Sequence, residues 1–155
     1  AQDIAALQQL NYTTGSGGYT NSTTPSIWPS KGVITSPYGT RVDPVTGAAS
    51  AFHEGVDIAD DYGTPIVATA AGTVTFAGYT EGGYGNLVEI DHGNGFVTRY
   101  GHNSAVLVTP GMTVKQGQVI ALMGSTGKST GAHVHYEVRI NGSAVDPMVF
   151  LPISN

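Results

Sequence analysis

Short runs of β-branched and aromatic residues, broken by glycine-rich turns, occupy most of this chain and constrain its fold more than any other feature. In the run NLVEIDHGNGFV, residues 86–97, Val88 and Ile90 alternate with two carboxylates, and the glycines that follow supply the turn of a hairpin. The 22 glycines and 8 prolines among 155 residues fit many such turns. The sequence therefore predicts an all-β fold of mainly antiparallel strands.

The N-terminal part of the chain has a different composition. Residues 1–12 carry apolar side chains three positions apart, which predicts a short amphipathic helix or an irregular extension. Residues 13–26 are rich in Gly, Ser and Thr, as flexible linkers are. With the boundary placed at Trp28, we expect three parts: an extension or linker over 1–27, one domain over 28–151 and a tail over 152–155.

Charge and residue usage exclude several functions. The net charge of −5 and the 6 basic residues argue against nucleic-acid binding, which needs clustered lysines and arginines. No apolar run reaches the length of about 18 residues that a membrane helix needs, so we expect no transmembrane segment in this chain. The chain has no cysteine, so histidines and carboxylates would have to hold any zinc ion. The oligomeric state stays open.

Two familiar motifs match only in part. GKST at 127–130 resembles the end of a phosphate-binding P-loop, but Leu122 stands where that motif needs its first glycine. A β-type run follows it, whereas a P-loop opens a helix. HEGVD at 53–57 begins like the helical zinc motif H-E-x-x-H, but its fifth residue is Asp57 and a glycine disfavours the helix. We therefore interpret Glu54 as a solvated loop carboxylate.

The segment HVHYEV, residues 133–138, is more informative. Side chains alternate along a strand, so His133 and His135 point to one side while the apolar residues between and after them point to the other. The apolar side predicts a core contact. The two imidazoles suit metal binding or proton transfer, although two half-exposed strand histidines are an equally simple interpretation.

Other polar positions could join these two histidines. His53 and Asp57 would lie about 13 Å apart in a fully extended strand, so sharing one zinc ion requires a bend, which Gly55 permits. His102 ends the β-type run TRYGH, and alone it would be read as a surface residue at a strand end. His92, in IDHGNG, is interpreted as a turn residue.

Five residues are thus candidates for one site: His53, Asp57, His102, His133 and His135. A catalytic zinc ion typically takes three protein ligands and keeps a position for water. The remaining two imidazoles could then orient or deprotonate the water and stabilise an oxyanion. The spacing does not decide which three are ligands.

Several stretches resemble the lysostaphin/LytM-type zinc endopeptidases, which cut peptidoglycan peptides. The stretches include FHEGVDIA, GTPIVATAAGTV, GNLVEIDHGNGFVTRYGH and GAHVHYEV, and the resemblance covers about residues 28–151. The motifs H-x-x-x-D, a lone downstream histidine and H-x-H occur in the family's order, which makes the resemblance specific. The departures are mild: Asn103 stands where many relatives have Leu, and Tyr136 where Phe is frequent.

The resemblance implies a fold and a site. The fold is an antiparallel β-sheet with a narrow groove walled by loops, for which segments 38–52 and 78–86 are candidates. The site implied is one Zn²⁺ per chain held by His53, Asp57 and His135, with His102 and His133 assisting catalysis. Three further residues could contact substrate, although packing or a surface ion pair would explain them equally well: Arg41, Tyr84 and Tyr100.

The function implied is zinc-dependent hydrolysis of peptide bonds in bacterial peptidoglycan, within stem peptides or cross-links. Peptidoglycan peptides would be the partners, and export to the bacterial cell envelope or outside the cell would follow. A non-cleaving module that binds peptidoglycan or regulates another hydrolase is one alternative. Another is a latent enzyme whose residues 1–27, with side chains such as Asn11, occupy the groove. The sequence does not indicate whether a D-amino-acid cross-link or a glycine bridge is cut.

Overall fold

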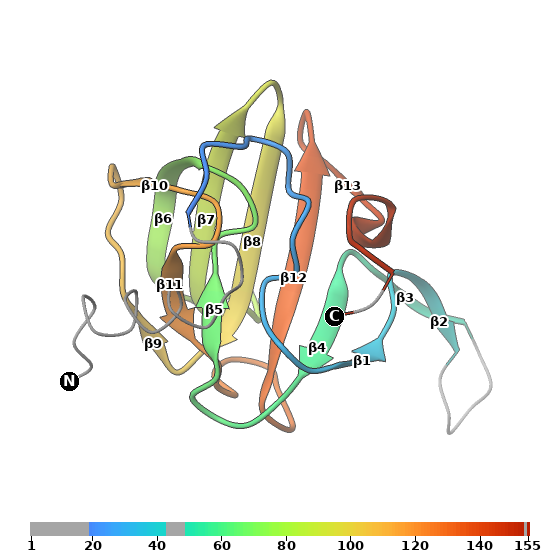
Figure 1. Ribbon diagram of the computed structural model, residues 1–155. Helices are drawn as coiled ribbons and strands as arrows, with labels where there is room; N and C mark the ends of the chain where they lie inside the picture. The colour runs from blue at the N-terminus through green and yellow to red at the C-terminus, as the bar shows by residue number, and fades with distance from the viewer. Residues whose placement is uncertain (1–18, 43–48, 154) are drawn as a thin grey trace.

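The computed structural model describes residues 19–42, 49–153 and 155. Antiparallel strands make up almost all of its regular structure, which confirms the predicted all-β fold (Figure 1). Within the described residues the one helical element is the 3₁₀ turn Pro147–Val149, and no helix is long and apolar enough to cross a membrane. The helix expected over 1–12 lies outside the described residues.

A large antiparallel sheet positions the candidate residues. Its strands are ordered β1-β4-β12-β8-β7-β6-β10, with β13 pairing with β12 off this path. Their bounds are Val33–Ser36 (β1), Val56–Ala59 (β4), His133–Ile140 (β12), Phe96–Asn103 (β8), Gly85–Gly93 (β7), Gly72–Thr80 (β6), Thr113–Val114 (β10) and Ser143–Val145 (β13). Because β4, β12 and β8 are neighbours, the candidates that they carry come together although they are far apart in sequence.

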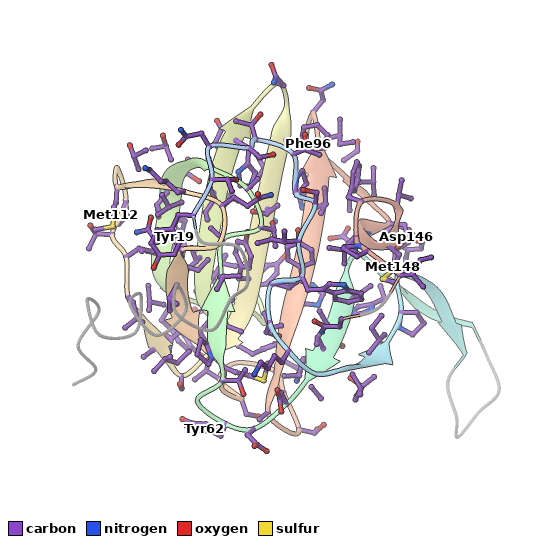
Figure 2. All side chains as sticks on the ribbon, in the orientation of Figure 1. Tyr19, Tyr62, Phe96, Met112, Asp146 and Met148 are labelled. Carbon is purple, nitrogen blue, oxygen red and sulfur yellow. The ribbon has the colours of Figure 1, made fainter. Side chains whose placement is uncertain are left out.

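A smaller sheet covers one face of the large one, and side chains from both sheets pack between them (Figure 2). It contains β5 (Pro65–Val67), β11 (Val119–Leu122) and β9 (Ala105–Val106). Ile66 and Ile120 of the smaller sheet share one fully buried core with Val88 and Tyr136 of the large sheet. Removing this apolar surface from water, at about 25 cal/mol per Å², is the main term that holds the two sheets together. A separate hairpin, β2 (Gly39–Val42) with β3 (Ala49–His53), leads into the site.

Side chains alternate across β12 as the sequence predicts. Val134, Tyr136 and Val138 are fully buried in the core, while His133 and His135 on the opposite face are only partly buried. At β12 the large sheet therefore has an apolar face in the core and a polar face that carries the two histidines.

Residues 19–26 are hydrogen-bonded to the domain, although their composition predicts a flexible linker. Gln116 anchors them: its backbone carbonyl accepts a bond from the Thr20 N–H, and its Nε2 donates to Thr24 O and to Ser26 Oγ. The composition could not reveal this because the partner lies 96 positions from Thr20. The domain boundary placed at Trp28 stays a prediction.

His92 is a buried strand residue, so its interpretation as a turn residue is wrong. It lies in β7 with 4% of its surface exposed, and its Nδ1 is 2.8 Å from the Ala71 carbonyl. Its Nε2 lies 2.7 Å from the Thr98 hydroxyl, which donates a hydrogen bond to the Tyr100 hydroxyl. Tyr100 bonds Thr69 in turn. The strand continues through His92 because these partners satisfy its ring, and the turn begins only after it.

Burial of His92 should make folding stability depend on pH. Burial lowers the pKa of His92 below its ordinary 6.5, although the hydrogen bond to the Ala71 carbonyl and the charge of Asp91 act in the opposite direction. As pH falls, His92 therefore takes up a proton in the unfolded chain before it does so in the folded protein. The free energy of unfolding should fall as pH drops below about 6.5 toward the folded pKa, and above about pH 6.5 His92 should not lower it. In urea titrations between about pH 5 and 7, His92→Gln should show a shallower slope of stability against pH than the wild type. Equal slopes in both proteins would contradict this role of His92.

Candidate metal centre

A bend between two strands brings His53 and Asp57 together. β3 ends at His53 and β4 begins at Val56, and the His53 Nε2 lies 3.3 Å from the Asp57 Oδ1. Gly55 is required here by close packing, since a Cβ at this position would lie 2.3 Å from the carbonyl oxygen of Tyr136. The structure thus confirms the bend that the sequence predicts at this glycine.

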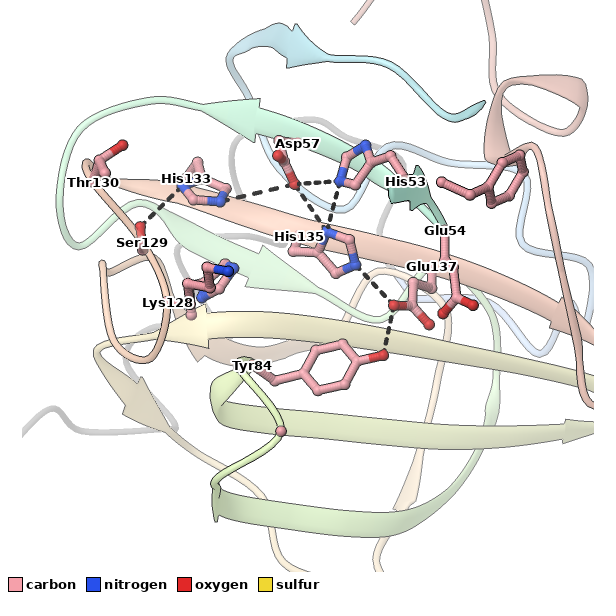
Figure 3. A pocket seen from close by; sticks show the side chains of 14 residues that line it. His53, Glu54, Asp57, Tyr84, Lys128, Ser129, Thr130, His133, His135 and Glu137 are labelled. Atoms are coloured by element: carbon pink, nitrogen blue, oxygen red, sulfur yellow. Dashed lines mark hydrogen bonds and ion pairs between the residues drawn. The ribbon is translucent and has the colours of Figure 1, made fainter. Parts of the chain in front are cut away.

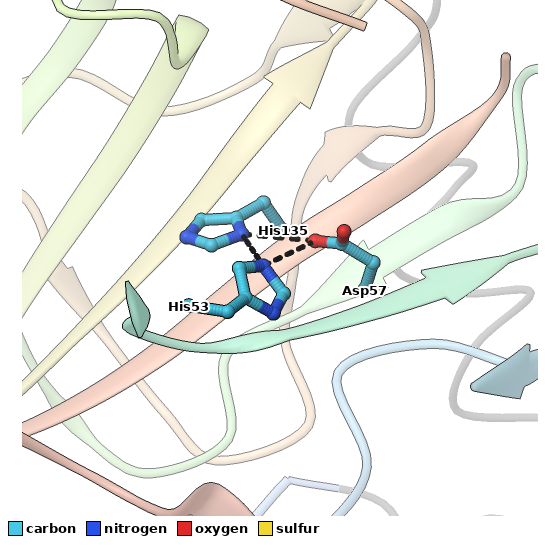
Figure 4. Close-up of side chains that lie close together, drawn as sticks. All are labelled: His53, Asp57 and His135. Atoms are coloured by element: carbon cyan, nitrogen blue, oxygen red, sulfur yellow. Dashed lines mark hydrogen bonds and ion pairs between the residues drawn. The ribbon is translucent and has the colours of Figure 1, made fainter. Parts of the chain in front are cut away.

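His135 reaches the same point from β12. The antiparallel register sets it opposite Asp57 on one side and opposite Gly101 on the other. Its Nδ1 lies 2.9 Å from Asp57 Oδ1 and 3.2 Å from His53 Nε2, so the three side chains converge (Figure 4). One ligand-type atom from each of the three lies within 4.8 Å of the others.

Hydrogen bonds on the far side of each ring set which nitrogen faces this point. His53 Nδ1 lies 2.8 Å from the Pro37 carbonyl, which can only accept, so Nδ1 carries the proton and Nε2 presents a lone pair. The His135 Nε2 lies 2.8 Å from the Glu137 carboxylate, so in the neutral ring Nε2–H donates and Nδ1 presents the lone pair. Two imidazole lone pairs and one carboxylate oxygen therefore face one another.

These three atoms fit a single zinc ion. In a tetrahedral site with Zn–N and Zn–O bonds of about 2.0–2.2 Å, neighbouring ligand atoms are about 3.3–3.6 Å apart. The observed separations of 2.9, 3.2 and 3.3 Å are at or a few tenths of an ångström below this range. Two imidazoles with one carboxylate is a donor set that catalytic zinc sites use. Facing lone pairs would repel unless a cation lay between them, so the residues present could hold Zn²⁺.

The carboxylates around His135 favour a positive charge at this position, whether it is a proton or a metal ion. Burial would lower the pKa of His135, but its hydrogen bonds to the Asp57 and Glu137 carboxylates outweigh burial and raise the pKa to about 9. Burial would raise the pKa of Asp57, but hydrogen bonds from His135 and His53 hold it well below its usual range. For Glu137, hydrogen bonds from His135 and Tyr84 likewise outweigh burial and lower the pKa to about 2. A proton on His135 takes the place that a metal ion could take.

His102 and His133 lie beside this centre with one nitrogen free. The His102 Nδ1 lies 2.7 Å from the Thr126 carbonyl, and the His133 Nδ1 lies 2.8 Å from the Gly131 carbonyl. In both neutral rings the carbonyl fixes the proton on Nδ1, so Nε2 presents a lone pair. The two ring centroids are 4.6 Å apart, and the His133 Nε2 is 3.8 Å from Asp57 Oδ1 (Figure 3). All five candidates thus belong to one site.

The backbone of His102 is held in an unusual conformation. Its φ of +67° lies in the left-handed region, where the other non-glycine residues described are Asn94 and Asn141, a type that tolerates it. The His102 N–H donates to the Tyr84 carbonyl at 2.6 Å, and its own carbonyl accepts from the Thr126 N–H at 3.3 Å. These bonds hold the strained residue so that its ring lies beside His133.

A groove of about 670 Å³ opens over the five residues. Its walls come from the β3–β4 bend with Phe52 and Glu54, from the β6–β7 turn at 82–84, and from the loop 128–130. The first two walls fall in segments adjoining or inside those expected from the sequence. The third wall is the Gly/Ser/Thr-rich run before H-x-H, and it brings the side chain of Lys128 to the groove (Figure 3).

The three residues expected to contact substrate have different positions. Tyr84 lines the groove, and its hydroxyl donates to Glu137 at 2.6 Å. Tyr100 points the other way: it is fully buried in the core, and its hydroxyl bonds Thr69, so the expected substrate contact is wrong. β8 alternates, and Tyr100 occupies a core-facing position beside Tyr136 at a ring distance of 5.4 Å. Arg41 lies in β2, and its side chain is outside the described part of the chain.

Glu137, Arg139 and Arg99 also belong to this site, although no pattern in the sequence was interpreted as placing them there. Glu137 is 1% exposed and contacts His135, Tyr84 and Arg139. The signal was present: residues 133, 135, 137 and 139 alternate on one face of β12, so the reasoning that placed both histidines there extends to Glu137 and Arg139. Arg99 contacts this group from β8, where no comparable pattern indicates it.

Comparison with known sequences gives a family and several relatives. Residues 51–147 match Peptidase family M23. The DD-carboxypeptidase/endopeptidase Mpg of Neisseria meningitidis is 49% identical over 120 residues, covering 77% of this chain and 27% of that protein. The murein hydrolase activator NlpD of Escherichia coli is 40% identical over 125 residues, covering 81% of this chain and 31% of that protein. The chain thus spans less than a third of the length of these two relatives.

Solved structures give the same result. A zinc containing peptidase from Vibrio cholerae is similar with a TM-score of 0.73 and 36% identity, over 84% of this chain and 40% of that one. The catalytic domain of the antimicrobial peptidase lysostaphin from Staphylococcus simulans is similar with a TM-score of 0.68 and 34% identity, over 76% of this chain and 90% of that one. Together with the family match over residues 51–147, these similarities confirm the resemblance seen in the sequence: the chain belongs to peptidase family M23.

Proposed function

We propose that this chain is a zinc-dependent endopeptidase that hydrolyses peptide bonds in bacterial peptidoglycan. The observation that carries the proposal is the convergence of His53, Asp57 and His135 at separations that suit one zinc ion. His102 and His133 stand beside them with unprotonated Nε2 atoms, so proton-transfer groups adjoin the ligand set. The open groove gives a peptide access to all five side chains.

His53 Nε2, Asp57 Oδ1 and His135 Nδ1 would hold the metal. When bound, Zn²⁺ supplies Lewis-acid chemistry, which lowers the pKa of water and stabilises negative charge on a carbonyl oxygen. The protein contributes a ligand set with a single carboxylate, so net positive charge remains at the centre. Pro37 and Glu137 orient the two imidazoles by accepting their remaining N–H groups.

His102 and His133 would handle protons and developing charge during hydrolysis. One Nε2 accepts the proton of the attacking water, and the other ring, when protonated, donates a hydrogen bond to the oxyanion. We assign the base role to His102. Burial lowers the pKa of His102, and the nearby His133 and His135 lower it further, although the hydrogen bond to the Thr126 carbonyl acts in the opposite direction. His102 is therefore an uncharged acceptor at neutral pH.

Peptidoglycan as substrate is supported by the relatives. One is called a DD-carboxypeptidase/endopeptidase and another a murein hydrolase activator, and murein is peptidoglycan. A substrate in the cell wall implies that the chain works in the bacterial envelope or outside the cell. The groove is open rather than enclosed, which suits a peptide within a polymer better than a small free molecule.

A second candidate function is activation of another hydrolase without cleavage. It is favoured by the 40% identity to NlpD. A non-cleaving activator has no need of three converging ligand atoms and two adjacent bases, so the complete set favours the enzyme. A latent form blocked by residues 1–27 is a further alternative. Of that segment, the described residues 19–27 are absent from the groove lining, while Asn11 lies outside the described residues.

Removing the metal or one of its ligands should stop cleavage. Purified peptidoglycan treated with the chain should release soluble peptide fragments, a chelator should stop the release, and added Zn²⁺ should restore it.

His135→Ala should lose zinc retention and cleavage together, because two of the three ligands cannot hold the ion. Mass spectrometry of the fragments identifies the bond cut. Full zinc occupancy without any fragment would contradict the enzymatic proposal and favour the activator.

Substituting His102 should separate zinc binding from turnover. His102→Ala should keep one zinc ion per chain while kcat falls about 10²- to 10⁴-fold, the usual contribution of a general base. His102→Gly should lose as much activity yet be more stable than His102→Ala by about 1 kcal/mol, because glycine adopts the positive φ without strain. Zinc content, peptide cleavage and urea unfolding measure the three quantities. Wild-type turnover in either variant would contradict the assignment of His102 as the general base.

A further inference from the structure

Glu137 is a charged side chain buried directly behind the candidate metal centre. It is 1% exposed and lies two residues after His135, on the same face of β12. Its Oε2 lies 2.8 Å from the His135 Nε2 and accepts from the Tyr84 hydroxyl at 2.6 Å (Figure 3). Its Oε1 accepts from Arg139 Nε at 2.8 Å. A buried carboxylate is costly unless it is fully bonded, so this arrangement calls for a reason.

The reason lies in the two sides of the His135 ring. A metal-binding imidazole must be neutral, so one of the two ring protons leaves when the metal binds and a single N–H remains. A carboxylate stands at each nitrogen: Asp57 at Nδ1, 2.9 Å away, and Glu137 at Nε2, 2.8 Å away. If the proton sits on Nδ1, it bonds Asp57 and no lone pair faces the metal position. If it sits on Nε2, it bonds Glu137 and Nδ1 is a ligand. Asp57 alone would therefore favour the tautomer that cannot bind metal.

We propose that Glu137 is a positioning residue that selects the metal-binding tautomer of His135. The inference rests on the zinc site proposed above and adds a cause for it: the carboxylate at Nε2 competes with Asp57 for the single proton and keeps Nδ1 free. Outer partners of this kind typically contribute about 10- to 100-fold to metal affinity.

The donors around Glu137 decide what can replace it. Arg99 Nη1 donates to the Tyr84 hydroxyl oxygen at 3.2 Å, so the Tyr84 proton is directed to Glu137. Arg139 can only donate, and it points at Oε1. Both carboxylate oxygens therefore face donors, and neither position suits an N–H group. Each arginine is also held by a second carboxylate: Glu89 lies 2.7 Å from Arg99 Nε, and Glu54 lies 2.6 Å from Arg139 Nη2.

A glutamine at position 137 would meet a conflict. If its amide oxygen accepts from Arg139, its NH₂ group faces the His135 Nε2 and favours the wrong tautomer. If its oxygen faces His135 and Tyr84, its NH₂ group opposes the Arg139 Nε–H. Removing Arg139 lifts the second conflict and lets the amide oxygen accept from the His135 Nε2–H. Removing Arg139 should thus restore the zinc affinity that Glu137→Gln lowers, and a role of Glu137 in packing alone does not predict this rescue.

The test is the Zn²⁺ affinity of the wild type and five variants, measured by competition with a chromophoric chelator. Relative to the wild type, Glu137→Ala and Glu137→Gln should bind zinc about 10- to 100-fold more weakly. Glu137→Gln combined with Arg139→Met should bind within a few-fold of Arg139→Met alone. Glu89→Gln, the matched control, makes the same chemical change in the same ion-pair chain without contacting His135, and it should leave affinity unchanged.

Long-range ¹H–¹⁵N spectra of the zinc-loaded proteins check that Nδ1 of His135 is the atom that binds the metal, while the affinities test the role of Glu137. The wild type and the double variant should show His135 protonated at Nε2. Wild-type zinc affinity in Glu137→Gln, or a double variant as weak as Glu137→Gln, would overturn the inference. Should Glu137→Ala fail to fold, the glutamine variants, which keep the side-chain volume, decide the question. A wild-type chain that binds no zinc would instead refute the proposed zinc site itself.

Discussion

The pairing of β4 with β12 links the packing of the core to the geometry of the candidate metal centre. Its register sets Asp57 opposite His135 and Val56 opposite Tyr136. Because side chains alternate, the same pairing sends Val56 and Tyr136 into the core and turns Asp57 and His135 toward the groove. A slip of one residue would exchange the two faces, burying charge and exposing the core. The packing energy of the core therefore also fixes the geometry of the site.

The polar face of the large sheet is organised around charge balance. His135 lies between the Asp57 and Glu137 carboxylates, and Glu137 lies between His135 and the arginines at 99 and 139. When His135 is protonated, each buried charge has an opposite charge beside it, which offsets part of the cost of removing it from water. This arrangement gives the centre a preference for a cation and holds the rings rigidly, two properties that a catalytic metal site needs.

Much of the fold and site could be predicted from the sequence because the signals are local. Alternation in HVHYEV placed two histidines opposite the core, and Gly55 indicated the bend that joins His53 to Asp57. The family resemblance then assigned roles that spacing left open. The failures involve partners from other segments of the chain: the Ala71 carbonyl lies 21 positions from His92, and Thr69 lies 31 positions from Tyr100. Residues 19–26 are likewise held by Gln116 from a distant loop.

Anomalous diffraction at the zinc absorption edge, from crystals of the zinc-loaded protein, would locate the metal and so test the proposed ligand set. That set requires one strong peak per chain, about 2 Å from His53 Nε2, His135 Nδ1 and a carboxylate oxygen of Asp57, with His102 and His133 outside bonding distance. A peak bonded to His102 or His133 in place of one of these three, or no peak between β3, β4 and β12, would contradict it.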